Sequence, residues 1–79
     1  MGKPINGLIK KMRNQPNGIT PAEAEKVLLG IGFEFRRQKG SHKHFKRKSD
    51  NKRFTLVVSH NPIKKYLVDE IMMIIDESN

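Results

Sequence analysis

The chain has 79 residues, 35% of them hydrophobic, no cysteine and a formal net charge of +8. This length allows one domain with one modest core, and the lack of cysteine excludes disulfides, thiolate metal sites and cysteine nucleophiles. No segment approaches the roughly 20 apolar residues of a membrane helix, and the first residues lack the apolar run of a signal peptide. We therefore expect a cytoplasmic protein without a membrane partner.

Two helices are predicted in the first part of the chain. The first is indicated by the helical spacing of four apolar residues, Ile5, Leu8, Ile9 and Met12. Residues 14–18 form turns readily, because they contain Pro16 and an Asn-Gly pair. The sequence Thr20-Pro21-Ala22-Glu23 has the form of a capping box, which predicts the start of the second helix. Glycines at 30 and 32 predict its end, and its buried face is expected to comprise Ala24, Val27, Leu28 and Ile31.

Three strands are expected next. Alternation over residues 33–38 predicts a strand with Phe33 and Phe35 directed inward, and Gly40-Ser41 predicts a tight hairpin turn. By the period of two, the second strand, residues 43–47, should direct Phe45 and Lys43 toward the core. The same period places His42, His44 and Lys46 on the opposite, solvated face. A second hairpin at residues 49–52 leads into a third strand, residues 53–58, with an inward face of Phe54, Leu56 and Val58.

A last helix is predicted from Ile63, because apolar residues recur there with helical spacing up to Ile75. The order is helix, helix, strand, strand, strand, helix. We therefore predict an α+β fold, with a three-stranded antiparallel sheet and helices packed on one face. Residues 1–79 are expected to form a single domain, with residues 1–18 as an N-terminal extension to a core of residues 20–77.

Positive charge is concentrated on the predicted sheet. Residues 36–53 contain nine of the sixteen Lys and Arg residues and one acid, Asp50. Such a cluster favours a polyanionic partner. His42 lies within it, and histidine both donates and accepts protons near neutral pH. The combination points to cleavage of nucleic acid, although a histidine beside a turn is, taken alone, more often an ordinary surface residue.

Several of these segments together resemble one known family. The segments are Gly32-Phe33-Glu34-Phe35, Arg37-Gln38-Lys39-Gly40-Ser41-His42, Arg53-Phe54-Thr55-Leu56 and Ile63-Lys64-Lys65. They are similar to the HicA family of mRNA interferase toxins, over roughly residues 22–75. The resemblance implies a fold like that of a double-stranded RNA-binding domain. It also implies RNA endonuclease activity on mRNA within a bacterial type II toxin–antitoxin system, inhibition by a cognate HicB-like antitoxin, and a catalytic role for His42, which follows Gly-Ser.

The other candidate site residues are expected to bind RNA rather than to react with it. They are Arg36, Arg37, Lys39, Ser41, Lys43 and His44. His44 and His60 are also considered as assistants in proton transfer. We expect no metal or other cofactor, since the eight acids are scattered and no zinc-ligand spacing occurs.

Two alternatives stay open at this point. The same basic face suits a non-catalytic module that binds double-stranded RNA by its backbone. The charge also suits an interaction domain for an acidic protein. A nuclease turns RNA over, a binding module only retards it, and a protein adaptor does neither.

Overall fold

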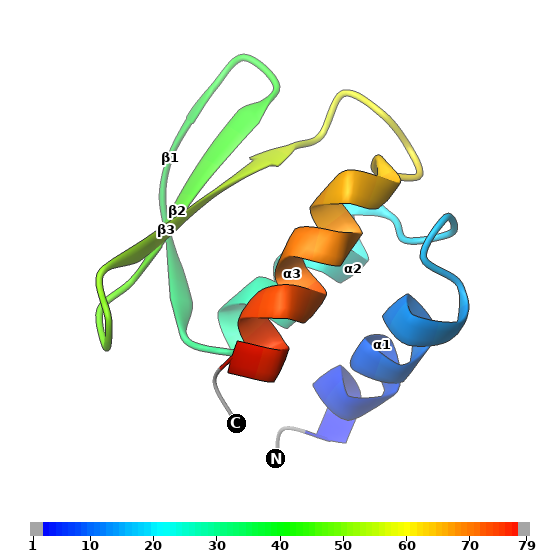
Figure 1. Cartoon of the computed structure of the whole chain (residues 1–79). Helices are drawn as coiled ribbons and strands as arrows, with labels where there is room; N and C mark the ends of the chain where they lie inside the picture. Colours follow the sequence, from blue (N-terminus) through cyan, green and yellow to red (C-terminus); the bar gives the residue numbers. More distant parts are fainter. Residues whose placement is uncertain (1–2, 78–79) are drawn as a thin grey trace.

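The computed structural model describes residues 3–77, which fold into a layer of helices packed against a layer of strands (Figure 1). The order of elements is the predicted one: α1 (Lys3–Asn14), α2 (Pro21–Gly30), β1 (Phe33–Lys39), β2 (His42–Arg47), β3 (Lys52–Val57) and α3 (Lys65–Glu77). None of the helices in this part of the chain is long and apolar enough to cross a membrane.

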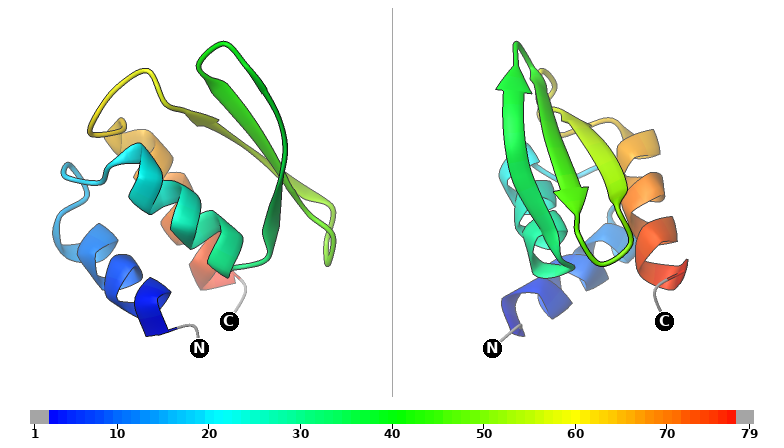
Figure 2. Two further views of the ribbon diagram at one scale, coloured as in Figure 1. Left: turned by 180° about the vertical axis from the view of Figure 1, so that it is seen from behind. Right: turned by 90° about the vertical axis from the view of Figure 1, so that its left-hand side faces the viewer.

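The three strands form one antiparallel sheet in the order β1-β2-β3. All three helices lie on the same side of this sheet, as Figure 1 and the left-hand view of Figure 2 show. The other side of the sheet, hereafter the open face, has no covering element within the described residues. This arrangement confirms the predicted α+β fold with helices on one face, and it is consistent with the arrangement of a double-stranded RNA-binding domain.

The start of α2 is fixed by the predicted capping box. The Glu23 amide donates to Thr20 Oγ1 at 3.2 Å, and the Thr20 amide donates to Glu23 Oε1 at 3.0 Å. Lys11 on α1 is a second partner of Glu23, with its ammonium 2.7 Å from Glu23 Oε2. The bonds from Lys11 and the Thr20 amide lower the pKa of Glu23. The capping box therefore also ties α1 to α2.

The core is made by all the helices and by the inner face of the sheet. Its fully buried members include Met12, Ile19, Ala24, Val27, Leu28, Leu56, Val68 and Ile71. Met12 comes from α1, so this helix contributes to the common core. At Gly30 a Cβ atom would lie 2.6 Å from the Ile5 side chain, which shows how closely α1 and α2 approach each other.

Some sequence expectations about burial and boundaries need correction. Strand alternation predicts that Phe35 points inward, and its register opposite the buried Phe45 puts it on the helix side, but Phe35 is still 47% exposed. It lies on the outer strand, where the helices give it little cover, and its ring packs edge-on against Phe45 with 5.8 Å between the centroids. The last helix begins at Lys65 rather than Ile63. Ile63 is nevertheless buried, and its amide donates to the Ile19 carbonyl at 2.8 Å.

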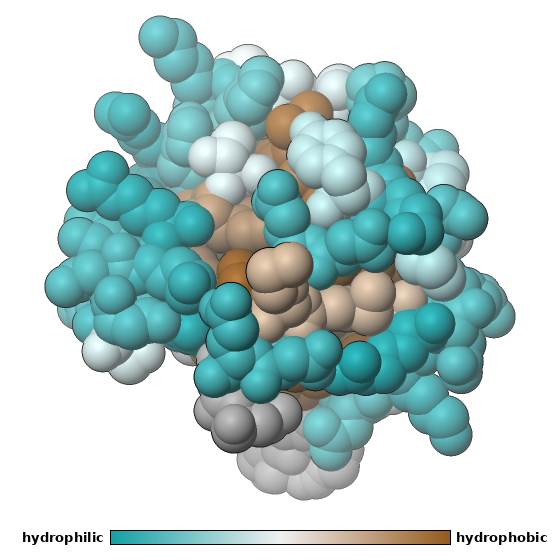
Figure 3. All heavy atoms as spheres, in the orientation of Figure 1, coloured by the Kyte–Doolittle hydropathy of each residue, from teal (hydrophilic) through white to brown (hydrophobic). Residues whose placement is uncertain are grey.

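The surface reflects this two-layer arrangement. In the orientation of Figure 1, hydrophilic side chains cover the sheet, whereas apolar side chains are visible toward the middle, over the helical layer (Figure 3). A surface dominated by hydrophilic groups therefore lies on the sheet side of the molecule, where the sequence predicts the polyanion site.

Candidate nucleic-acid interface

The open face is organised as three rows that run across the strands. Residues directly opposite one another on neighbouring strands share a face of the sheet. Starting from the β1–β2 turn, the rows are Lys39, His42 and Val57; then Arg37, His44 and Thr55; then Glu34, Lys46 and Arg53. Every row carries at least one Lys or Arg, and Glu34 is the one acid among these nine residues. The face therefore presents positive charge along its whole length.

His42 is the first residue of β2, and its side chain is exposed. The turn before it follows from the sequence, because Gly40 has a φ of 58°, a left-handed conformation that glycine adopts without strain. The Ser41 carbonyl accepts a hydrogen bond from the Val58 amide at 2.9 Å, which ties the turn to the end of β3. His42 thus stands beside a fixed hairpin, opposite Lys39.

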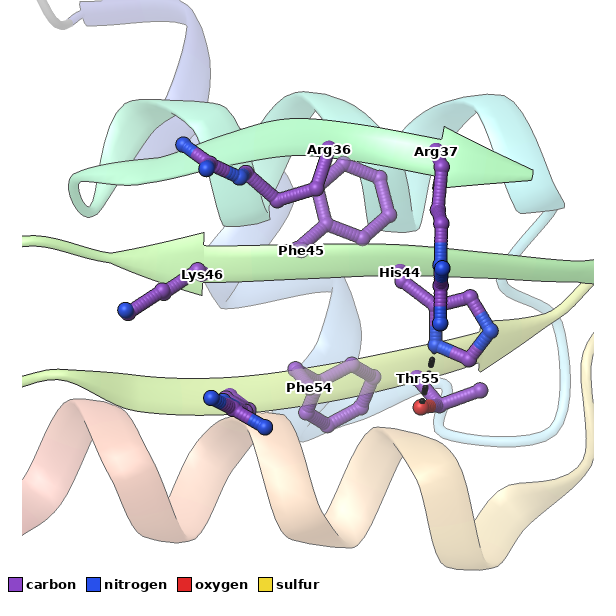
Figure 4. A pocket seen from close by; sticks show the side chains of 8 residues that line it. Arg36, Arg37, His44, Phe45, Lys46, Phe54 and Thr55 are labelled. Carbon is purple, nitrogen blue, oxygen red and sulfur yellow. Dashed lines mark hydrogen bonds between the residues drawn. The ribbon is translucent and has the colours of Figure 1, made fainter.

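His44 lies two residues further along β2 and is partly buried. Its Nδ1 atom is 3.2 Å from Thr55 Oγ1 on β3, and the proton lies on one atom or the other according to the tautomer of the ring. Arg37 stands opposite His44 on β1, and its side chain extends across β2 toward the imidazole (Figure 4). His44 is therefore held from one neighbouring strand and approached by a cation from the other.

A β-bulge at Arg36 brings two consecutive arginines to the open face. Phe35 pairs with Phe45 and Arg37 pairs with His44, so Arg36 is an extra residue without a partner on β2. Regular alternation after Phe33 and Phe35 would turn Arg37 toward the helices. The bulge shifts the register by one residue, and both arginines line the open face. Glu34 lies close to Arg36, at 4.0 Å between charged atoms, and both side chains are exposed.

These residues surround a depression of about 590 Å³. Its lining comprises Arg36, Arg37, His44, Phe45, Lys46, Arg53, Phe54 and Thr55. Figure 4 shows seven of these side chains labelled, gathered from all three strands. The volume is within the range of small-ligand sites, roughly 300–1,000 Å³. His42 does not line the depression, although it stands on the same face one row nearer the turn.

Not every cation of the basic segment belongs to the open face. Lys43 is on the helix side of β2, with its ammonium 3.1 Å from Glu25 Oε1 on α2. Arg47 is 8% exposed, and its guanidinium lies 5.1 Å from the centre of the Phe33 ring. It donates to Asp50 at 3.1 and 2.7 Å and to the Ile31 carbonyl at 3.3 Å. Arg47 therefore serves the core rather than a ligand.

Comparison with known proteins identifies the family. A sequence model described as HicA toxin of bacterial toxin-antitoxin matches residues 21–76. The chain belongs to the HicA toxin family. Neither a curated protein nor a solved structure matches the chain significantly. The matched segment of this HicA chain runs from the start of α2 almost to the end of α3, and α1 precedes it. Toxins of the HicA family cleave mRNA.

The structure gathers most of the residues proposed from sequence for this HicA chain. Arg36, Arg37 and His44 line the depression, and Lys39 and His42 form the row beside it. Ser41 lies in the turn. His60 follows β3 three residues after Val57 and is not a member of the rows, and its Nδ1 atom is 3.2 Å from Ser59 Oγ. Within residues 3–77 no three His, Asp or Glu side chains are grouped to hold a metal ion.

Three polar members of the depression are not among the site residues predicted from sequence. They are Lys46, Arg53 and Thr55. The signal that would find them is the cross-strand register, because Lys46 and Arg53 are opposite each other and Thr55 is opposite His44. Period-two alternation gives the face on which each residue lies, but it does not give the register between strands.

Proposed function

We propose that this HicA-family protein is the toxin of a type II toxin–antitoxin system and cleaves mRNA through His42, without a metal cofactor. The observation that carries the proposal is the position of His42. Its exposed imidazole follows the Gly40-Ser41 turn on the open face, with Lys39 opposite it on β1. This gives a proton-transfer group and a phosphate-binding cation at one place on a positively charged face.

Cleavage of RNA needs a base, an acid and a cation that stabilises the charge on the phosphate. A base removes the proton of the ribose 2′-hydroxyl, the 2′-oxygen attacks phosphorus, and the bond from phosphorus to the 5′-oxygen breaks as that oxygen takes up a proton. The products are a 2′,3′-cyclic phosphate and a 5′-hydroxyl. His42 supplies one of the two proton transfers, and Lys39 stabilises the negative charge that develops on the phosphate oxygens.

The proposed partner is a HicB-type antitoxin. A protein that neutralises this surface needs acidic side chains that compete with phosphate for Lys39, Arg36 and Arg37. It should also bury His42 when bound. A toxin–antitoxin complex that leaves the His42 side chain as exposed as it is in the free chain would contradict this mode of inhibition.

The test is digestion of single-stranded RNA by the parent protein, His42→Ala and His60→Ala, each with and without excess chelator. His60 is the matched control, because it is an exposed histidine in the segment after β3 and is not a member of the open-face rows. We expect His42→Ala to lose roughly 10²- to 10⁴-fold in rate, while His60→Ala and the chelated parent retain activity. Both variants should stay within about 0.5 kcal/mol of the parent in stability.

A folded His42→Ala protein that cleaves at the parent rate would contradict the role of His42. Loss of parent activity on chelation, restored by magnesium, would contradict the metal-independent mechanism. Retarded but uncleaved RNA would favour the non-catalytic RNA-binding module instead.

A further inference from the structure

The open face repeats one arrangement in two successive rows. In the first row Lys39 is opposite His42, and in the second row Arg37 is opposite His44. The two histidines are two residues apart on β2, which separates their Cα atoms by roughly 7 Å. Each row thus pairs a cation on β1 with an imidazole on β2. The proposed function uses only the row of His42.

The histidine of the second row has a side-chain partner on β3, whereas the histidine of the first row has none opposite it there. His44 is partly buried and contacts Thr55 at 3.2 Å, whereas the residue on β3 opposite His42 is Val57, which offers no side-chain hydrogen bond. When the Thr55 hydroxyl donates to Nδ1, the ring proton lies on Nε2. In the imidazolium form both nitrogens carry protons. In these two forms Nε2 donates a hydrogen bond, which suits an anionic oxygen, whereas in the neutral tautomer with the proton on Nδ1 it would accept one.

The surroundings of His44 also favour an anion. The bulge places both Arg36 and Arg37 at the depression, and Lys46 and Arg53 line it as well. No Asp or Glu is among the residues that line it. Four cations and one oriented imidazole therefore converge on a space of about 590 Å³, one row from His42.

We propose that the row of Arg37, His44 and Thr55 is a subsite for the RNA phosphate next to the one that is cleaved. His44 and Arg37 hold this neighbouring phosphate, and Thr55 orients His44. Binding of this neighbouring phosphate selects the register in which the scissile phosphate reaches His42, so His44 contributes to substrate binding and takes no part in the proton transfers. This inference rests on the proposed function, since it presupposes that cleavage occurs at His42.

The substrate for the test is a 2′-O-methyl oligoribonucleotide with one free 2′-hydroxyl, prepared with each of the four bases at that position. Only one bond in it is cleavable, because attack requires the free 2′-hydroxyl. The phosphodiester on the 5′ side or on the 3′ side of this bond is replaced by an uncharged methylphosphonate. A replacement several nucleotides away serves as the control for loss of overall charge.

We expect one of the two adjacent replacements to lower kcat/KM roughly tenfold to a hundredfold, as loss of hydrogen bonds to a charged group should do. The remote replacement should have a smaller effect. His44→Ala should reduce the difference in kcat/KM between substrates with a charged and an uncharged neighbouring linkage, and the part that remains is due to Arg37. Its loss on the fully charged substrate should appear mainly in KM, with kcat retained. Thr55→Val, which keeps the side-chain shape but removes the hydroxyl, should give the same pattern more weakly.

Three results would be decisive against the subsite. Equal rates with charged and uncharged neighbours would overturn it, and so would a His44→Ala protein that is as sensitive to the replacement as the parent. A His44→Ala protein that loses kcat on every substrate would make His44 a catalytic residue instead. If the parent cleaves unmodified RNA, these failures concern the subsite alone, whereas a folded parent that leaves unmodified RNA intact contradicts the proposed function itself.

Discussion

Glu25 on α2 holds Lys43 on the helix side of the sheet, with 3.1 Å between the carboxylate oxygen and the ammonium. Both neighbours of Lys43 in sequence, His42 and His44, lie on the open face. Strand alternation thus separates a lysine that joins β2 to a helix from two histidines that face the proposed RNA. A basic residue within the basic segment is therefore not necessarily a residue that faces RNA.

This separation predicts different salt dependences. Arg36→Ala with Arg37→Ala should reduce the slope of log affinity against log salt concentration by roughly 1.4, since each phosphate that a cation neutralises on single-stranded RNA adds about 0.7 to the slope. Lys43→Ala should leave the slope close to the parent value, because its charge is already paired. The measurement is RNA binding by a cleavage-deficient His42→Ala background over a salt series. An unchanged slope in the arginine double variant would locate the RNA elsewhere.

Arg47 should act on stability and not on RNA binding. Its guanidinium packs on Phe33 and donates to Asp50 and the Ile31 carbonyl, and Gly32 leaves room for its side chain. Arg47→Ala should lower the free energy of unfolding by about 2–3 kcal/mol, because it removes these charged hydrogen bonds and the packing on the ring. Arg53→Ala, at an exposed position, should change it by less than about 0.5 kcal/mol. Equal unfolding curves for the two variants would refute this structural role.

The alternation of residue types is enough to place most side chains on the correct face of the sheet. It places His42, His44 and Lys46 on the open face and Lys43 on the helix side, as the structure has them. The capping box predicts the start of α2 correctly, because its hydrogen bonds are local in sequence. Sequence patterns therefore predict a structural feature correctly when the interactions that determine it join residues close together in the chain.

The β-bulge at Arg36 cannot be predicted from the alternation of residue types. Arg36 and Arg37 are both charged, so nothing in the pattern marks the residue at which alternation breaks. Phe35 is apolar and is therefore predicted inward, but its exposure depends on how far the helices extend over the outer strand. The partnership of His44 with Thr55 depends on the register between β2 and β3, which the sequence of one strand does not contain.

Asp50 should make stability depend on pH in the acid range. The hydrogen bond from Arg47, assisted by the Lys52 amide, lowers the pKa of Asp50 to about 2. In the unfolded chain an Asp titrates near 3.9, so the unfolded state binds more protons between these values. The contribution of Asp50 is fully present above about pH 4 and is lost as the pH falls to about 2. Urea unfolding over this pH series should show a shallower decline for Asp50→Asn than for the parent. If the unfolding free energy of the two proteins declined equally with falling pH, Asp50 would not contribute to the pH dependence of stability.

The last prediction concerns α1, which precedes the segment matched by the HicA family. Met12 on this helix is fully buried, whereas Met73 on α3 is 60% exposed, so the two form a matched pair of the same residue type. Removing a buried methionine side chain leaves a cavity that neighbours fill only in part. Met12→Ala should therefore cost about 2–5 kcal/mol of unfolding free energy, and Met73→Ala less than about 0.5 kcal/mol. Both are measured by urea denaturation. If Met12→Ala proved as mild as Met73→Ala, the burial of the Met12 side chain would contribute nothing to the stability of the fold.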